Sequence, residues 1–408
     1  MNLPRVGVVC DLREENWPSM DLVGEMLLTH LQRDHADSFS STRLCPPMRR
    51  RLTSQRSEIR GQKSEVGGQS SEVGGQKSEA RGRRFNADRF LNRFWDYPRV
   101  ARQRRDEFDL FHLVDHSYGQ LVHQLPPDRT VITCHDLDTF RCLLVTNGDR
   151  RGWLFKAMMK RTLSGFSKAA RVVCDSRATY DELLAHDLVS PGRLSVVPLG
   201  VHPAFSAAPN AVADAEAARL LNLNGAETID ILHVGSTIKR KRVDVLLRVL
   251  AEVRKQFPRT RLIRVGGAFT AQQQLLSQRL NLRGSIVVLP HLERGVLAAV
   301  YRRAALVLLP SEREGFGLPV IEAMACGTPV VASDLPVLHE VGGEAASYCP
   351  VADVNTWRDT VCALLTERNK SPERWAARRE QGIQNAARFS WAEYARKMVG
   401  IYREVLSS

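Results

Sequence analysis

The residues with the clearest chemical potential are two glutamates eight positions apart, Glu314 and Glu322, in the segment EGFGLPVIE. An apolar run typical of a strand ends just before them, and Gly315 and Gly317 then allow backbone conformations that other residues resist. We expect Glu314 in a loop and Glu322 in the first turn of the following helix. Both carboxylates could accept hydrogen bonds from a diol, such as a sugar or a ribose offers. Solvated glutamates at an ordinary strand–loop–helix joint would show the same pattern.

The start of that helix is a second candidate binding element. Pro319 suits a first helical turn, because its missing amide is not needed there. The amides of Phe316, Gly317 and Leu318 are therefore expected to point out of the helix start. Backbone amides in that position bind anions and hydroxyl groups.

A cluster of four basic residues follows another apolar run in the segment ILHVGSTIKRKRVDV. Gly235 and Ser236 end the expected strand, and Arg240 and Lys241 come shortly before an expected helix. These two cations could neutralise a diphosphate, because a guanidinium group can bind two oxygens at once. A solvated basic loop is the alternative, and the run lacks the spacing of a P-loop.

Short apolar runs alternate with amphipathic helical patterns along most of the chain, which predicts an α/β fold with parallel sheets in βαβ units. A chain of 408 residues is long for one hydrophobic core, so we expect two domains, residues 1–200 and 201–388, and a C-terminal helix over 389–408. The hinge is placed at Val196–Pro203. The predicted strands are Val6–Cys10, Leu110–Val114, Thr130–Cys134, Arg171–Cys174, Ile229–Val234, Arg261–Val265, Ile286–Leu289, Leu306–Leu309 and Pro329–Ala332.

The net charge of +13 is concentrated in one part of the chain. Between Arg43 and Arg105 there are 17 Lys or Arg and 6 Asp or Glu residues, so 17 − 6 = +11 of the charge lies there. This favours a local surface patch over a nucleic-acid-binding fold. The eight cysteines form no C-x-x-C pair, which favours a reducing cytoplasm and argues against a zinc site. No stretch of about 18 apolar residues and no signal-peptide pattern occurs.

Two segments within this basic region need separate interpretations. A seven-residue unit repeats four times from Ser57 to Arg84 and is rich in Gly, Gln, Ser and Glu, which predicts a flexible, disordered insert over residues 54–84 without a catalytic role. The following stretch, Arg83–Arg105, is basic and aromatic. One face of the expected helix would carry the four large apolar residues Phe90, Leu91, Phe94 and Trp95. Such a face is typical either of a membrane-surface helix or of a helix packed on the first domain.

Several segments together resemble a known family of enzymes. EGFGLPVIE is similar to the E-x7-E motif of retaining nucleotide-sugar glycosyltransferases of family 4 (group 1). In the order of that family, the chain also carries similar segments that read VVCDSRATYDEL, VVPLGVHPAF, HVGSTIKRKRVDVLL and LAAVYRRAALVLLPSEREGFGLP. These cover most of residues 171–333. The resemblance implies two Rossmann-like domains facing a cleft, the GT-B fold.

The resemblance also implies roles for individual residues. Lys241 with Arg240 matches the basic pair on the donor diphosphate, in the loop that starts with Gly235 and Ser236. Glu322 matches the carboxylate that binds the ribose diol. Glu314 matches the carboxylate that faces the donor sugar. The amides of Phe316, Gly317 and Leu318 match those that hold sugar hydroxyls or phosphate. His135 matches a histidine at a strand end of the first domain, which also faces the donor sugar.

The N-terminal half departs from the family pattern. Many relatives have a Gly-rich loop after the first strand, where this chain has DLREENWPSMD, Asp11–Asp21. Trp17 could stack on the apolar face of an acceptor sugar, although a packing role explains it equally well. His116 and His112, in HLVDHSYGQL, are further candidates for the cleft.

The function we expect is transfer of a sugar, with retention of anomeric configuration, from a nucleotide-diphosphate sugar to a glycan, lipid-linked or small-molecule acceptor. His135 and Glu314 are the expected catalytic residues, and domain closure would bring His135 to the donor. No metal and no cofactor besides the donor substrate are expected, and no nucleic-acid partner. A nucleotide-sugar epimerase or hydrolase of the same fold, or a non-enzymatic basic adaptor, are the alternatives. The expected location is the cytoplasm, with peripheral contact at the inner membrane surface as a further option.

Overall fold

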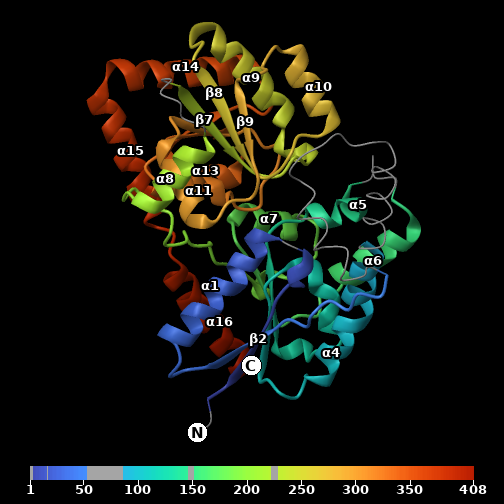
Figure 1. The fold of residues 1–408 in the computed structure, drawn as a ribbon. Helices are drawn as coiled ribbons and strands as arrows, with labels where there is room; N and C mark the ends of the chain where they lie inside the picture. The colour runs from blue at the N-terminus through green and yellow to red at the C-terminus, as the bar shows by residue number, and fades with distance from the viewer. Residues whose placement is uncertain (1–2, 16, 53–85, 146–150, 222–227) are drawn as a thin grey trace. The chain divides into compact units, whose positions relative to one another are not determined.

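The computed structural model describes residues 3–15, 17–52, 86–145, 151–221 and 228–408. The insert predicted over residues 54–84 lies outside them. The chain divides into two compact units, which Figure 1 shows coloured along the sequence. Unit 1 consists of Met1–Asp175, Thr179–Val197 and Ala395–Ser408, and unit 2 consists of Ser176–Ala178 and Pro198–Tyr394.

Unit 1 is built on a six-stranded parallel sheet with the order β2-β1-β3-β4-β5-β6. Its central strands are apolar along their length, because a parallel sheet is covered on both faces. The strands are β1 (Arg5–Val9), β2 (Ser40–Leu44), β3 (Leu110–Leu113), β4 (Thr130–Cys134), β5 (Arg171–Cys174) and β6 (Leu194–Val196).

The helices of unit 1 include one that returns from the end of the chain. The ring of Tyr402 in this helix, α16, packs edge-on against Phe39, just before β2. The α-helices are α1 (Pro18–Asp34), α4 (Tyr97–Gln103), α5 (Arg141–Leu144), α6 (Trp153–Leu163), most of α7 (Arg177–Ala185) and most of α16 (Trp391–Ser407). The segment η2 (Asn92–Asp96) is a π-helix that leads into α4, and the 3-10 helices are η1 (Arg13–Glu15), η3 (His116–His123), η4 (Pro127–Arg129), η5 (Asp138–Phe140) and η6 (Pro191–Arg193).

Unit 2 repeats the architecture with a second six-stranded parallel sheet, in the order β12-β11-β10-β7-β8-β9. The strands are β7 (Ile229–Val234), β8 (Thr260–Val265), β9 (Ile286–Leu289), β10 (Leu306–Leu309), β11 (Val330–Ser333) and β12 (Ala346–Cys349). The helices are α8 (Ala211–Leu220), α9 (Val243–Gln256), α10 (Ala271–Arg279), α11 (Arg294–Arg303), α12 (Leu318–Ala325), α13 (Pro336–Gly342), α14 (Val354–Lys370) and α15 (Pro372–Ala386), with turns η7 (Lys239–Lys241) and η8 (Gly343–Ala345).

One core of unit 2 lies between the sheet and the helices α9 and α14. Leu246, Leu250 and the fully buried Trp357 pack there against Ile231 of β7 and Leu262 of β8. Figure 1 shows α9 and α10 beside the strands β7, β8 and β9. This packing fixes the carboxyl ends of the strands, where ligands bind in open parallel sheets.

The nine predicted strands are all present, and none differs from its predicted bounds by more than one residue at either end. Three strands were missed: β2, β6 and β12. All three lie at sheet edges, where a strand is covered less completely and its sequence is correspondingly less apolar. The α/β prediction with two Rossmann-like sheets is confirmed.

The predicted basic and aromatic helix is present over residues 86–103, and its buried side is polar as far as Asp96 and apolar at Tyr97 and Ala101. Asp88, Asn92 and Asp96 are buried there, and they accept hydrogen bonds from backbone amides and an arginine of residues 49–52. Phe94 packs against the unit 1 core, whereas Trp95 is 58% exposed. The four apolar residues therefore do not form one face packed on unit 1, which was one of the two interpretations, since Phe90 and Trp95 are exposed.

No helix among the described residues is long and apolar enough to span a membrane. Within the same residues, no group of three or more His, Cys, Asp or Glu side chains is arranged to hold a metal ion.

Candidate functional site

In unit 2, the two predicted donor-binding segments meet at the carboxyl ends of β7 and β10. Lys241, at the end of η7, places its Nζ 2.6 Å from Oε1 and 2.9 Å from Oε2 of Glu314. Arg240 Nη1 donates to the carbonyl of Arg313 at 2.8 Å and approaches Glu314 Oε2 at 3.4 Å. The sequence assigned these side chains to the diphosphate and the sugar, and the structure joins them in one ion-paired cluster.

This ion pair is largely removed from water. The side chains of Glu314 and Lys241 are only 7% and 12% exposed. Burial raises the pKa of Glu314, but the charges of Lys241 and Arg240 outweigh burial and bring the pKa below its ordinary value. The carboxylate is therefore ionised at neutral pH, and it holds the Lys241 ammonium in a defined position.

The start of α12 forms the second part of the cluster. Gly317 precedes the helix with φ of +103°, a conformation that L side chains rarely adopt, and an added Cβ would approach Leu338 to 2.8 Å. The amides of Phe316, Gly317 and Leu318 donate to no acceptor in the described parts of the chain. They are thus available to a ligand, as expected for a helix start.

Glu322 lies in the second turn of α12, not in the first turn as predicted, because the helix begins at Leu318. Its Oε2 accepts a hydrogen bond from the Tyr301 hydroxyl of α11 at 2.9 Å. Burial raises the pKa of Glu322 to about 7, although Tyr301 acts in the opposite direction. The carboxyl group is therefore divided between its two protonation states near neutral pH.

Tyr301→Phe is expected to weaken donor binding at pH 7. It should also shift the midpoint of the pH dependence of donor affinity to a higher pH. Without the hydroxyl, the ionised form of Glu322 loses a hydrogen bond, so its pKa rises above about 7 and fewer molecules carry the carboxylate that accepts bonds from a diol. Donor dissociation constants measured between pH 6 and 9 should converge with the parent at high pH. Tyr348→Phe, which loses a hydroxyl bonded only to backbone carbonyls, is the matched control. Identical pH profiles in all three proteins would contradict the prediction.

In unit 1, His135 directly follows β4 and is held on both sides of its ring. Nδ1 lies 2.5 Å from Oδ2 of Asp175, and Nε2 lies 2.7 Å from the carbonyl oxygen of Val114. Both partners only accept, so both nitrogens carry protons. Burial lowers the pKa of His135, but Asp175 reverses this and raises the pKa to about 9. A contact from Nε2 to a sugar requires that this nitrogen leave the Val114 carbonyl.

His116 lies beside His135 with one ring nitrogen unused. The backbone amide of His135 donates to His116 Nδ1 at 3.3 Å, which places the proton of the neutral ring on Nε2. Nε2 has no hydrogen-bond partner among the described residues, and the nearest carboxylate oxygen, of Asp136, is 3.8 Å away. Burial lowers the pKa of His116, which keeps the ring neutral. His116 is thus better placed than His135 to donate to a new ligand without breaking an existing bond.

Two further carboxyl groups stand next to these histidines. Asp11 follows β1 and Asp115 follows β3. Burial, together with the charge of Asp115, raises the pKa of Asp11 well above its ordinary value. Burial would raise the pKa of Asp115, but the neighbouring His116 ring, the charge of Arg93 and the protonated His135 outweigh burial and bring the pKa below its ordinary value. The two carboxyl groups therefore have pKa values shifted in opposite directions, upward for Asp11 and downward for Asp115.

The other two candidates in the first half make no hydrogen bond to His116 or His135 among the described residues. His112 is fully buried in β3, bonded to the Tyr402 hydroxyl at 2.7 Å and to Thr133 Oγ1 at 2.8 Å. Burial lowers the pKa of His112 to about 3, so it is a structural histidine and not a cleft residue as proposed. Trp17 stands at the start of α1 with 49% of its surface exposed, and no contact joins it to His116 in the described structure.

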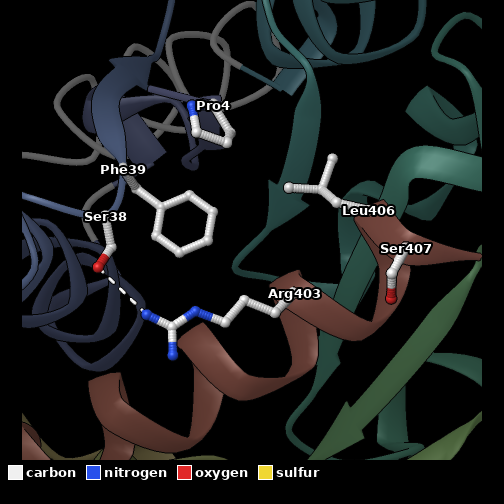
Figure 2. Close-up of a pocket in the computed structure, with 6 residues that line it drawn as sticks. All are labelled: Pro4, Ser38, Phe39, Arg403, Leu406 and Ser407. Atoms are coloured by element: carbon white, nitrogen blue, oxygen red, sulfur yellow. Dashed lines mark hydrogen bonds between the residues drawn. The ribbon is translucent and has the colours of Figure 1, made fainter. Parts of the chain in front are cut away.

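A pocket of about 340 Å³ lies at the opposite end of the unit 1 sheet. Figure 2 shows its lining, which comes from the residues before β1 and β2 and from the end of α16. Arg403 donates to Ser38 Oγ at 3.1 Å along one wall. These residues lie at the amino ends of the strands, so the pocket is separate from the clusters at the carboxyl ends.

Sequence reasoning missed the partners that set the charge of the candidate residues. Asp175 directly follows β5, and Asp115 lies two residues after the end of β3. A carboxylate close to a strand end was the signal that could have identified them. Tyr301 lies in the last turn of α11, and nothing in its neighbourhood in the sequence marks it as the partner of Glu322.

Comparison with protein families assigns both halves of the chain. Residues 221–382 match the model described as "Glycosyl transferases group 1", and residues 64–205 match "Glycosyltransferase Family 4". Among named relatives, D-inositol 3-phosphate glycosyltransferase of Segniliparus rotundus is 32% identical over 288 residues, which cover 68% of this chain and 61% of that protein. The protein of the same name from Rhodococcus opacus is 30% identical over 322 residues, which cover 74% of this chain and 70% of that protein.

Solved structures with the same fold cover nearly the whole chain. Sucrose-phosphate synthase from Thermosynechococcus elongatus superimposes with a TM-score of 0.67 at 19% identity, covering 99% of both chains. The Anabaena protein HepE, solved in complex with UDP and glucose, has a TM-score of 0.69 at 13% identity and covers 98% of this chain and 100% of its own. At these identities the likeness shows the fold alone.

Proposed function

The chain belongs to the group 1 glycosyltransferases of family 4, and from this premise we propose that it transfers a sugar from a nucleotide-diphosphate sugar to an acceptor with retention of anomeric configuration. The observation that supports the proposal most is the cluster of Lys241, Arg240 and Glu314 beside the free amides of α12. It offers cations for a diphosphate, and amides and carboxylates for hydroxyl groups.

Each part of the cluster has a task in this reaction. Charge develops on the diphosphate as the sugar leaves, and Lys241, Arg240 and the amides at the start of α12 would stabilise this charge without the reorganisation that water would need. These groups can supply the stabilisation that a metal ion supplies in other enzymes. Glu322 would accept hydrogen bonds from the ribose diol, and Glu314 would orient the donor sugar while fixing Lys241.

The acceptor is proposed in broader terms. The two relatives described above are named for D-inositol 3-phosphate, and this chain spans 61% and 70% of their lengths. We propose a hydroxyl acceptor that is a small polyol, a glycan or a lipid-linked sugar. In unit 1, His116 and the Asp11–Asp115 pair are the groups suited to bind its hydroxyls, because together they offer a ring N–H donor and carboxyl acceptors.

The decisive experiment is turnover of a panel of nucleotide sugars, followed by mass spectrometry with and without polyol and glycan acceptors. A transferase releases nucleoside diphosphate and forms a glycosylated product only when the acceptor is present. Release of free sugar at the same rate without acceptor would identify a hydrolase, and an isomeric nucleotide sugar an epimerase. Proton NMR of the first product formed would report whether the anomeric configuration is retained.

Peripheral membrane contact is also proposed, through helix α6. The solvent-facing side of α6 carries Trp153, 81% exposed, and Leu154, 56% exposed, together with the exposed cations Lys160 and Arg161. Residues 151–168 contain five Lys or Arg and no acidic residue. Exposed apolar side chains next to cations match a bilayer surface that contains anionic lipid.

Vesicle binding tests this contact directly. The parent protein should co-sediment with phosphatidylcholine vesicles containing phosphatidylglycerol, and far less with phosphatidylcholine alone. Changing Trp153→Ser, Leu154→Ser and Lys160→Glu together should lower the vesicle-bound fraction about tenfold or more, since each cation near an anionic surface contributes about 1 kcal/mol. A matched variant of unit 2, Val212→Ser with Arg368→Glu, should bind as the parent does. Equal binding of all three proteins would refute α6 as the contact.

A further inference from the structure

Two polar residues interrupt the apolar face of the unit 2 sheet at its carboxyl edge. His233 of β7 and Arg264 of β8 are cross-strand partners in register. They lie two residues beyond Ile231 and Leu262, which pack in the core below α9, so their side chains lie on the same buried face. Both are 0% exposed. His233 opens the segment HVGSTIKRKRVDVLL but was given no role there, and Arg264 lies outside the donor-site motifs found in the sequence.

Arg264 joins the two loops that follow β7 and β8. Its Nη2 donates to the carbonyl of Gly235 at 2.8 Å and reaches that of Gly266 at 3.5 Å, and its Nη1 donates to the carbonyl of Gly267. The loops touch at this point, since a Cβ added at Gly266 would lie 2.3 Å from the Gly235 oxygen. The guanidinium group therefore holds three carbonyl oxygens of adjacent loops turned toward itself.

The charge of Arg264 has no carboxylate to balance it. No acidic side chain lies within ion-pair distance of Arg264 in the described chain, whereas nearby Lys241 is balanced by Glu314. Burial and the charges of Arg264 and Lys241 lower the pKa of His233 to about 3, so His233 is neutral. Besides these carbonyls, the guanidinium carbon of Arg264 lies 5.5 Å from the centre of the Phe269 ring. A buried cation without a carboxylate partner is costly, and an apolar residue of similar size would fill the same space at less cost.

The positive charge lies next to the proposed donor site. Gly235 opens the predicted diphosphate loop, and a Cβ added there would lie 3.4 Å from the His233 ring and 3.9 Å from the Lys241 side chain. His233, Arg264 and Lys241 are thus gathered around one loop, with Lys241 at its ligand-facing end. An anion bound at Lys241 would experience the unbalanced charge of Arg264 through a medium of low dielectric constant.

We propose that Arg264 is a positioning residue for the donor diphosphate. It ties the loops after β7 and β8 together and turns their carbonyl oxygens away from the anion. It also supplies a buried positive charge that the bound diphosphate balances. This inference rests on the proposed nucleotide-sugar function. It assigns to Arg264 an effect on affinity for diphosphate but not on affinity for the nucleoside.

A counter-charge placed at His233 tests the electrostatic part without removing Arg264. His233→Glu puts a carboxylate beside Arg264 within the sheet, and His233→Gln is the matched neutral variant. The probe is whichever of UDP, GDP or ADP the parent binds most tightly by calorimetry, with the corresponding nucleoside for comparison. His233→Glu should weaken diphosphate binding about tenfold or more and leave nucleoside binding within about twofold, while His233→Gln stays close to the parent.

Two further variants test the loop-holding part and guard against misfolding. Arg264→Met removes the charge and the hydrogen bonds, so it should weaken diphosphate binding about 10- to 100-fold. Arg264→Lys keeps the charge, so its loss of diphosphate affinity should be clearly smaller. In turnover assays the effect should appear in KM for the donor more than in kcat. Thermal melting shows which variants fold. If His233→Glu does not fold, the comparison of Arg264→Met with Arg264→Lys tests whether the charge of Arg264 contributes to diphosphate affinity.

The outcomes separate this inference from the proposed function. Parent-like diphosphate affinity in the folded variants, or equal weakening of diphosphate and nucleoside, would overturn the role of Arg264 while the transferase proposal stands. A parent protein that binds no nucleoside diphosphate would overturn both. A selective loss of diphosphate affinity supports the inference.

Discussion

Replacing Lys241 with alanine is expected to weaken nucleotide-sugar binding about 10- to 150-fold and to lower the free energy of unfolding by about 3–5 kcal/mol. The first effect follows from loss of a cation at the proposed diphosphate. The second follows from Glu314, whose carboxylate is only 7% exposed and whose shortest contact to an ammonium, 2.6 Å, would disappear. Calorimetric donor binding and urea unfolding measure the two effects separately.

Two companion variants show whether the effects share this origin. Lys241→Met combined with Glu314→Gln removes both charges, so most of the stability should return while donor binding stays weak. Lys255→Ala removes a cation whose side chain is 71% exposed and pairs with Glu252 on α9, and it should change neither quantity appreciably. Donor affinity at the parent level in Lys241→Ala would exclude Lys241 from the donor site.

The second large effect concerns His135 and Asp175 and depends on pH. The pKa of His135, about 9, is above the 6.5 of an unfolded chain, so the pair stabilises the fold fully below pH 6.5 and loses that contribution as the pH rises through 9. A difference of this size corresponds to about 3 kcal/mol. Asp175→Asn should therefore destabilise unit 1 by about that amount at pH 6 and by much less at pH 9.5.

Denaturant unfolding at pH 6, 7.5 and 9.5 checks this prediction. Asp109→Asn is a suitable control in the same unit, because Asp109 pairs with Arg5, which does not titrate in this range. The decrease in the free energy of unfolding caused by Asp109→Asn should be the same at all three pH values. A pH-independent cost for Asp175→Asn would mean that His135 is not protonated in the folded protein.

The sequence by itself determined the α/β class, the nine strands and the composition of the donor-site segments. Strands such as Ile229–Val234 and Leu306–Leu309 are covered on both faces, so their apolar runs are continuous and their ends are abrupt. The segment EGFGLPVIE was equally informative, because Gly317 and Pro319 carry local backbone requirements that only a few residue types meet.

Only the tertiary structure decided which of these groups act together. Residues that are 21 to 73 positions apart are joined in the pairs Lys241–Glu314, Tyr301–Glu322 and His135–Asp175. The bond from Arg264 to Gly235 spans 29 positions. Side-chain charge and pKa depend on the neighbours that the fold supplies and on removal from water. A local pattern in the sequence carries neither quantity, so the residues could be proposed from the sequence but their ionisation and partners could not.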